Sequence, residues 1–273
     1  MYKVGLSSSG FALTDNNFKA LNQSGIGAIE ISMPSELYGS INYRELAELS
    51  KRYGVDLWSY HLPFWPFTQF DVSSTNGELR KSTIEYYTQL IEKAADIGID
   101  KFIVHPSGEP ISDDVREERI KCSMQSLDTL AEIAHSHGAV IAVEDLPRTC
   151  LGNTADEVAR LASVNDKLRV CFDTNHLLSD TNVNFLDKLG DKIITLHVSD
   201  YDFVDEKHWL PGEGLVDWAE LLAKLREIKY AGVWMYEINL SNPKMLTRSR
   251  DLTFEDFVEN ANALFAGMQP KRI

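Results

Sequence analysis

The sequence has few cysteines and no long apolar run. Its 273 residues include three cysteines, Cys122, Cys150 and Cys171, which lie far apart and form no Cys-x-x-Cys pair. This spacing argues against a secreted disulfide scaffold and against a thiolate zinc site, and it fits a reducing compartment. The N-terminal apolar run is too short for a signal peptide, and no run of about 18 apolar residues is present. We therefore expect a cytoplasmic protein with no membrane-spanning segment.

Positive charge is also scarce. The chain carries 27 Lys and Arg against 41 Asp and Glu, a formal net charge of −14. An acidic surface repels phosphate backbones and anionic lipids, which disfavours nucleic acid and membranes as partners, although a local basic groove or bound metal ions could override this average. The P-loop motif GxxxxGK[ST] and the nucleophile elbow GxSxG are both missing, so neither chemistry is expected.

Short apolar runs alternate with longer segments of helical period. The helical segments include 78–97, 112–137 and 217–228, with Gly98 and Gly138 as stop signals and capping-box patterns at Thr154 and Asp217. Several of the apolar runs lack the polar alternation of a half-exposed strand, which indicates a parallel sheet covered on both faces. The predicted strands are 3–8, 26–32, 55–60, 101–105, 139–144, 168–173, 192–198 and 232–238.

Eight strand–helix pairs predict the fold class, an α/β protein formed by a single (β/α)8 barrel domain over residues 1–273. The alternative is an open, doubly wound sheet. The barrel is favoured because no GxGxxG follows the first strand, as a dinucleotide-binding fold would require. A homo-oligomer is compatible with this sequence, which does not determine the number of subunits.

Ionisable side chains occur at or just after the ends of successive predicted strands. In a parallel barrel these ends meet at one mouth, where active sites are found. Each residue alone has an ordinary explanation as a cap or a satisfied hydrogen bonder, but the repetition along the chain points to a shared site. Carboxylates and imidazoles held together suit a divalent cation. The residues are Glu30, His61, His105, Glu144, Asp173, His197 and Glu237, with His208 in a later loop as a secondary candidate.

With these residues in view, the chain resembles the sugar phosphate isomerase/epimerase family of xylose isomerase-like TIM barrels. The resemblance covers essentially the whole chain, and the order of its motifs is its most specific feature. The segments that carry it are Val143-Glu144-Asp-Leu-Pro147, Phe172-Asp173-Thr-Asn-His176, Leu196-His197-Val-Ser-Asp200, Pro211-Gly-Glu-Gly214 and Tyr236-Glu237-Ile238.

The resemblance implies one divalent ion, Mn²⁺, Co²⁺, Zn²⁺ or Mg²⁺, held by Glu144, Asp173, His197 and Glu237. It implies a sugar or keto-polyol isomerase or epimerase, in which Glu144 and Glu237 move a proton next to a carbonyl through a metal-stabilised enediolate. Substrate contacts are implied for His61, His105, Arg148, His176 and His208. The segment 62–67, Leu-Pro-Phe-Trp-Pro-Phe, is either an apolar wall of the substrate site or simple packing over the mouth.

Endonuclease IV, a relative within the same superfamily, leaves a second interpretation open. Its three metals use nine positions, and this chain is similar at all of them, with Glu206 where that family has an aspartate. Two or three Zn²⁺ ions and hydrolysis of abasic DNA would follow. The acidic net charge and the lack of a basic stripe favour a small sugar instead. A related metal-dependent lyase or dehydratase is the third alternative.

Overall fold

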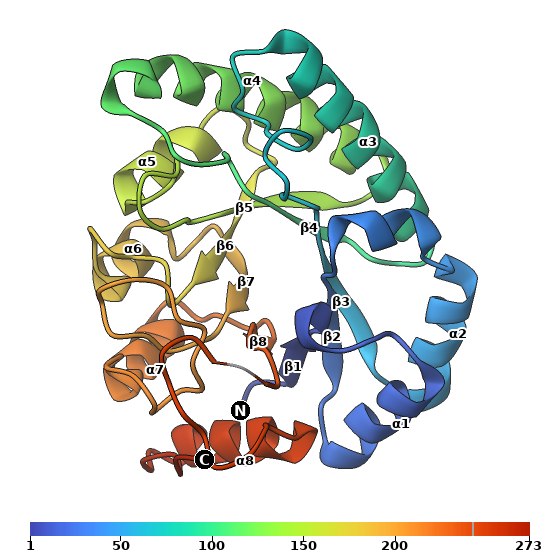
Figure 1. Cartoon of the computed structure of the whole chain (residues 1–273), viewed down its shortest axis with the longest axis vertical. Coiled ribbons are helices and arrows are strands. Elements are labelled where there is room, and N and C mark those ends of the chain that lie inside the picture. The colour runs from blue at the N-terminus through green and yellow to red at the C-terminus, as the bar shows by residue number, and fades with distance from the viewer. Residues whose placement is uncertain (242) are drawn as a thin grey trace.

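Eight parallel strands form one sheet that closes on itself. The structure, a computed structural model, describes residues 1–241 and 243–273. The strands follow the order β7-β6-β5-β4-β3-β2-β1-β8, and a parallel bridge between Val198 and Tyr236 joins the two ends. The predicted (β/α)8 barrel is therefore confirmed (Figure 1). The strands are β1 Val4–Ser7, β2 Ala28–Ile31, β3 Asp56–His61, β4 Lys101–Val104, β5 Val140–Glu144, β6 Arg169–Asp173, β7 Ile193–His197 and β8 Trp234–Tyr236.

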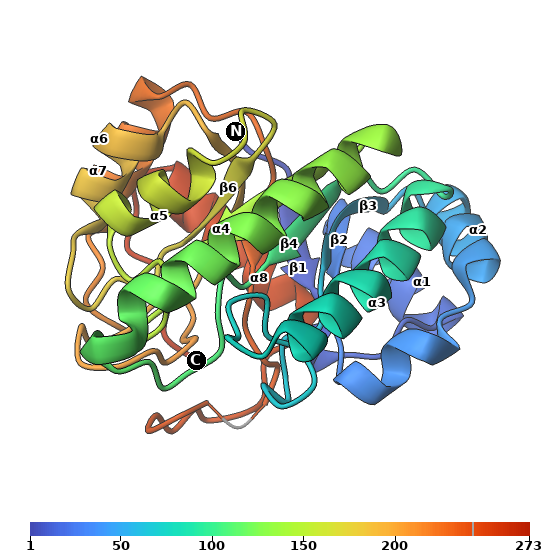
Figure 2. The same cartoon turned by 90° about the horizontal axis from the view of Figure 1, so that it is seen from above.

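Helices surround the strands on the outside of the barrel (Figures 1 and 2). The predicted helices 78–97, 112–137 and 217–228 correspond to α3, α4 and α7, with ends within one or two residues. No helix in the described part of the chain is both long and apolar enough to cross a membrane. The helices are α1 Asp15–Ser24, α2 Tyr43–Tyr53, α3 Gly77–Ala95, α4 Asp113–Ser136, α5 Ala155–Ala162, α6 Asn182–Leu189, α7 Trp218–Glu227 and α8 Phe254–Phe265, with 3-10 turns η1 Ser8–Gly10 and η2 Ser35–Ser40.

The helix ends follow local sequence signals. The side chains of Thr154 and Asp217 accept hydrogen bonds from backbone N–H groups in the first turns of α5 and α7. Gly98 has a φ of +92° and follows α3 closely, in the left-handed conformation that glycine adopts without strain. Only half of the predicted capping box at Thr154 forms, because the Glu157 carboxylate accepts from Gly152 N–H and pairs with Arg116 instead.

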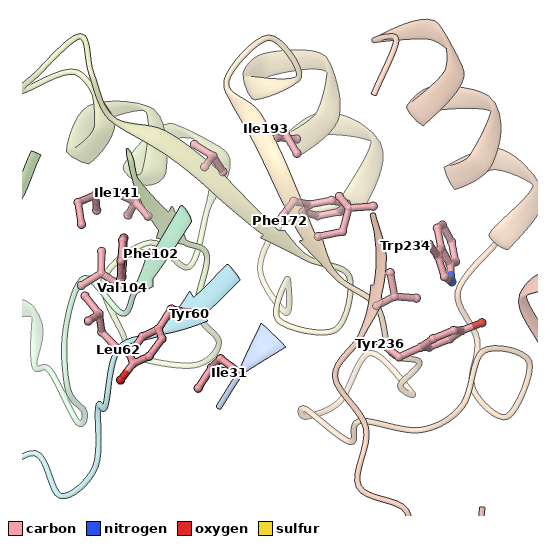
Figure 3. Packing of buried hydrophobic residues seen from close by; sticks show 14 of the residues in the cluster. Ile31, Tyr60, Leu62, Phe102, Val104, Ile141, Phe172, Ile193, Trp234 and Tyr236 are labelled. Atoms are coloured by element: carbon pink, nitrogen blue, oxygen red, sulfur yellow. The ribbon is translucent and has the colours of Figure 1, made fainter. Parts of the chain in front are cut away.

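Side chains alternate between the helix layer and the barrel interior along each strand. Phe102, Phe172 and Trp234 are fully buried in the large apolar cluster between strands and helices (Figure 3). Two small apolar clusters fill the barrel interior. One contains Ala28 and Met235, and the other contains Ala142 and Cys171. The apolar strands thus supply both layers of packing, as their continuous hydrophobicity predicts.

The loop after β7 is organised by the buried carboxylate of Asp200. Its oxygens accept hydrogen bonds from the backbone N–H groups of Gly212 and Val216 and from the Trp218 indole. Gly214 lies directly against this carboxylate, and a Cβ there would overlap both Asp200 and the Tyr201 carbonyl. The Pro211–Gly214 motif therefore has a packing reason: glycine allows the loop to close around Asp200.

We predict that Gly214→Ala lowers the free energy of unfolding by about 1–3 kcal/mol, the usual cost of overpacking a tight site. Urea unfolding followed by circular dichroism measures the change. Gly39→Ala is the matched control, since a Cβ at Gly39 meets nothing within 4 Å. Equal stability of the two variants would contradict the packing role of Gly214.

Candidate metal centre

Side chains alternate in direction along each strand, and this places the site residues predicted at strand ends inside the barrel, at its C-terminal mouth. Glu144 follows the inward-facing Ala142 by two residues, and Asp173 follows Cys171 in the same way. Because side chains two apart on a strand share a face, each carboxylate points inward, one layer above the apolar filling. Neighbouring strands are paired so that Asp173 lies beside His197. The same alternation and strand pairing recur around the barrel and bring together residues that are distant in sequence.

Four side chains from β5 to the end of β8 converge on one point. His197 Nδ1 lies 2.8 Å from Glu144 Oε1, 3.5 Å from Glu237 Oε2 and 3.9 Å from Asp173 Oδ2. One donor atom from each residue lies within 4.8 Å of the other three. Three of the side chains are inaccessible to solvent, and Glu237 is slightly exposed toward the mouth. These are the four residues for which the resemblance implies metal binding.

The donor set fits a divalent cation. Asp173 Oδ1 accepts the Asn175 N–H, whereas Asp173 Oδ2 is buried and has no hydrogen-bond partner among the described residues. A buried carboxylate oxygen without a partner is costly. Burial and the nearby Glu144 charge raise the pKa of Asp173 to about 8. Burial also raises the pKa of Glu237. A cation between these oxygens would offset both the cost of burying the charged carboxylates and their mutual repulsion.

His61 and His105 lie on one flank of this centre. Their Nε2 atoms lie 3.2 Å and 3.1 Å from Glu144 Oε2, so both imidazoles face the same carboxylate oxygen. Burial alone would lower the pKa of His61, but the hydrogen bond and charge of Glu144 raise it to about 9. Burial dominates at His105 and lowers its pKa to about 4. The three residues form a second group able to hold a metal ion.

His176, Glu206 and His208 form a third such group on the opposite flank. His176 Nε2 lies 3.6 Å from Glu206 Oε2 and 3.7 Å from Asp173 Oδ2. Glu206 Oε1 faces away and accepts from Lys244 Nζ at 2.9 Å. Burial would raise the pKa of Glu206, but His176, His208, Lys244 and Arg148 lower it to about 2. Lys244 and Arg148 therefore already supply positive charge beside this carboxylate.

Arg148 lies on the rim of the mouth and links three loops. Its Nε and Nη2 donate to the two oxygens of Glu109, and its Nη1 donates to Asp205. Each guanidinium nitrogen therefore already faces a carboxylate. The predicted substrate contact by Arg148 stays a prediction, and any such contact would have to share these hydrogen bonds.

A cavity of about 260 Å³ leads from the rim to the centre, and its lining includes His105, His176, Glu206, His208 and Glu237. Three aromatic residues of the 62–67 segment, Phe64, Trp65 and Phe67, form one wall. Phe64 stacks on the His105 ring at 4.1 Å between centroids. The segment therefore lines the cavity and packs on a site residue at the same time. A larger cavity of about 440 Å³ beside η2 contains none of the candidate ligands.

Two further carboxylates contact the centre without having been given a role. Glu30, noted only as a strand-end residue, accepts from His197 Nε2. Asp145 accepts the Asp173 N–H and is fully buried, and burial and the Asp173 charge raise its pKa. The signal for Glu30 was present in its position near the end of β2, whereas Asp145 follows Glu144 directly and gave no separate pattern.

The fold and the site together define a class of protein: a (β/α)8 barrel with buried carboxylates and imidazoles gathered at the C-terminal mouth. A model of the xylose isomerase-like TIM barrel family matches residues 18–255. The chain belongs to this family.

The relatives include sugar epimerases. An uncharacterized protein of Methanocaldococcus jannaschii, MJ1311, is 30% identical over 230 residues, which cover 81% of this chain and 76% of that protein. Fructoselysine 3-epimerase of Escherichia coli O157:H7 is 29% identical over 148 residues, 48% of this chain and 53% of the enzyme. The solved structure of a D-tagatose 3-epimerase-like protein is 27% identical, with a TM-score of 0.81 and coverage of 97% of this chain and 96% of the other.

The raised pKa of Asp173 predicts how the metal-free protein responds to pH. A carboxyl whose pKa rises on folding, from 3.8 to about 8, binds its proton more tightly in the folded state. Its stabilising contribution is therefore complete below pH 3.8 and is lost as the pH rises through 8. Between pH 5 and 7, the free energy of unfolding of the wild type should fall with rising pH relative to that of Asp173→Asn, on the order of 1 kcal/mol per pH unit.

Urea titrations of both proteins in EDTA at pH 5, 6 and 7 measure this difference. The asparagine side chain keeps the shape and the acceptor oxygen of the protonated carboxyl but cannot ionise, which makes it the appropriate comparison. Parallel pH dependences for the two proteins would show that Asp173 does not hold a proton in the metal-free state.

Proposed function

We propose that this protein is a divalent-metal-dependent sugar isomerase or epimerase that moves a proton at the carbon next to a carbonyl group. The substrate class is a ketose, a ketose phosphate or a cyclic keto-polyol. The observation that carries the proposal is the convergence of Glu144, Asp173, His197 and Glu237 around the unpartnered Asp173 Oδ2. Family membership and the similarity to fructoselysine 3-epimerase support it.

The ligands proposed for the cation are Glu144, Asp173, His197 and Glu237. Three carboxylates and one neutral imidazole suit Mn²⁺, Co²⁺, Mg²⁺ or Zn²⁺. When bound, the cation polarises the substrate carbonyl and stabilises the negative charge of the enediolate. Asp173 and His197 are fully buried, and their task in the proposal is to hold the ion in place.

Glu144 and Glu237 are the proposed acid–base pair. Glu237 lines the cavity, where its carboxylate can reach a bound substrate and act as a general base. One carboxylate takes the proton from the carbon next to the carbonyl. The other delivers a proton to the opposite face in an epimerisation, or to the neighbouring carbon in an isomerisation. Because the reaction is reversible, each group acts as the base in one direction.

The proposed substrate contacts come from both flanks of the cavity. His105, His176 and His208 line it and present imidazole nitrogens suited to sugar hydroxyls. His61 lies deeper, beside Glu144, where its proton can be shared with that carboxylate. Phe64 and Trp65 supply an apolar wall that excludes water from the reacting carbon.

Glu237→Gln tests the proton transfer. We expect this variant to lose the exchange of the substrate α-hydrogen with D₂O by about 100- to 10,000-fold, the usual contribution of a general base. Exchange is followed by proton NMR with ketoses and cyclic keto-polyols in the presence of Mn²⁺. EDTA should abolish exchange by the wild type, and added Mn²⁺ should restore it. Unchanged exchange in Glu237→Gln would exclude the proposed role.

A second candidate function rests on the two flanking groups of ligands. His61, His105 and Glu144 on one side, and His176, Glu206 and His208 on the other, offer sites for two more ions beside the central one. Endonuclease IV-like hydrolysis of abasic DNA is the function that three zinc ions would favour. Two observations favour the sugar enzyme: the net charge of −14 and the pairing of Glu206 with Lys244 and Arg148.

The number of bound metal ions separates the two candidates. We expect one tightly bound ion per chain when the protein is purified without chelator and analysed by inductively coupled plasma mass spectrometry. The expected reason is that Lys244 and Arg148 oppose a further cation at Glu206. Three zinc ions per chain, together with cleavage of a duplex containing an abasic site, would establish the nuclease instead.

A further inference from the structure

We propose that Glu30 is a positioning residue that aims the Nδ1 atom of His197 at the metal. The inference rests on the proposed function, because it assigns a task to a residue behind the proposed ligand set. Its basis is geometric: Glu30 lies on the side of the His197 ring away from the other three ligands.

The two nitrogens of His197 face different partners. His197 Nε2 lies 2.9 Å and 3.0 Å from the two oxygens of Glu30. His197 Nδ1 points to the opposite side, toward Glu144, Glu237 and Asp173. When Nε2 carries the proton and donates it to Glu30, the lone pair of a neutral ring is on Nδ1, where the carboxylates gather. The Glu30 hydrogen bond thereby selects the tautomer and the ring orientation that a metal needs.

Glu30 is itself held in place. It is fully buried near the end of β2, and its Oε2 accepts a hydrogen bond from Ser59 Oγ at 2.7 Å. The pairing of β2 with β3 shifts after Ile29, so that Leu57 and Ser59 lie beside Ile29 and Glu30 while Trp58 is the extra residue. This irregularity brings the Ser59 hydroxyl beside the Glu30 carboxylate. Irregularities of this kind re-aim side chains next to active sites.

A simpler role for Glu30, as a negative charge that only attracts the cation, makes a different prediction for the geometry of the ligands. If Glu30 acts through its charge alone, Glu30→Gln weakens metal binding but leaves the ligand geometry unchanged. If Glu30 also orients the ring, the weaker amide acceptor holds His197 less firmly, so the metal binds more weakly and its ligand geometry changes. A geometry-sensitive readout therefore distinguishes positioning from charge alone.

The experiment is a Mn²⁺ titration of the metal-free protein, in which the electron paramagnetic resonance signal of free Mn²⁺ reports the unbound ion. We expect Glu30→Gln to raise the dissociation constant by about 10- to 100-fold, as mutation of the partner behind a ligating histidine usually does. A second readout is the visible absorption spectrum of bound Co²⁺, whose band positions depend on ligand geometry. We expect these bands to shift in Glu30→Gln.

Glu213→Gln is the matched control, because Glu213 is a buried glutamate that pairs with Arg248 outside the ligand set. It should keep the Mn²⁺ affinity and the Co²⁺ spectrum of the wild type. Should Glu30→Gln fail to fold, Ser59→Ala replaces it, with a smaller weakening expected because one Glu30 oxygen loses its support. Wild-type or tighter Mn²⁺ binding, or unchanged Co²⁺ bands, in whichever of these two variants folds would overturn the positioning role alone. Failure of the wild type itself to bind Mn²⁺ or Co²⁺ would overturn the metal dependence of the proposed function as well.

Discussion

Repulsion among buried carboxylates is the constraint on which this site depends. Glu144 and Asp173 end strands of the barrel, Glu237 directly follows one, and all three reach the same small, largely buried volume, where water screens their charges poorly. The protein offsets part of this cost with imidazoles, and the high pKa of Asp173 shows what is left. A barrel that gathers acidic groups in this way gains stability from any cation that it can hold there.

Neighbouring residues contact the proposed ligands and the loops around them. His61 and His105 face one oxygen of Glu144, and Glu30 faces the far nitrogen of His197. At the rim, Arg148 joins the loops that follow β4, β5 and β7 through Glu109 and Asp205. The chemistry thus lies at the ends of rigid strands, while the loops between strands and helices shape the entrance and its charge.

Sequence reasoning succeeded where one physical rule repeats along the chain. Short apolar runs between helical segments predicted all eight strands, and the continuous runs among them reflect strands that are buried on both faces. Ionisable residues at strand ends predicted most of the side chains that the structure brings together, because parallel strands end at one mouth. The predicted capping box at Thr154 was wrong for its second half. The Glu157 carboxylate binds Gly152 N–H and Arg116 instead of the Thr154 backbone N–H. Arg116 lies on α4, and the local sequence around Thr154 does not reveal that α4 packs beside it.

The sequence by itself determined the barrel and the gathering of Glu144, Asp173, His197 and Glu237, since both follow from the order of apolar and ionisable residues. Only the tertiary structure decided which nitrogen of His197 meets Glu30, a residue 167 positions away. It also decided that the guanidinium nitrogens of Arg148 donate to Glu109 and Asp205. Such pairings depend on strand register and loop position to within an ångström, and these are set by packing of the whole barrel.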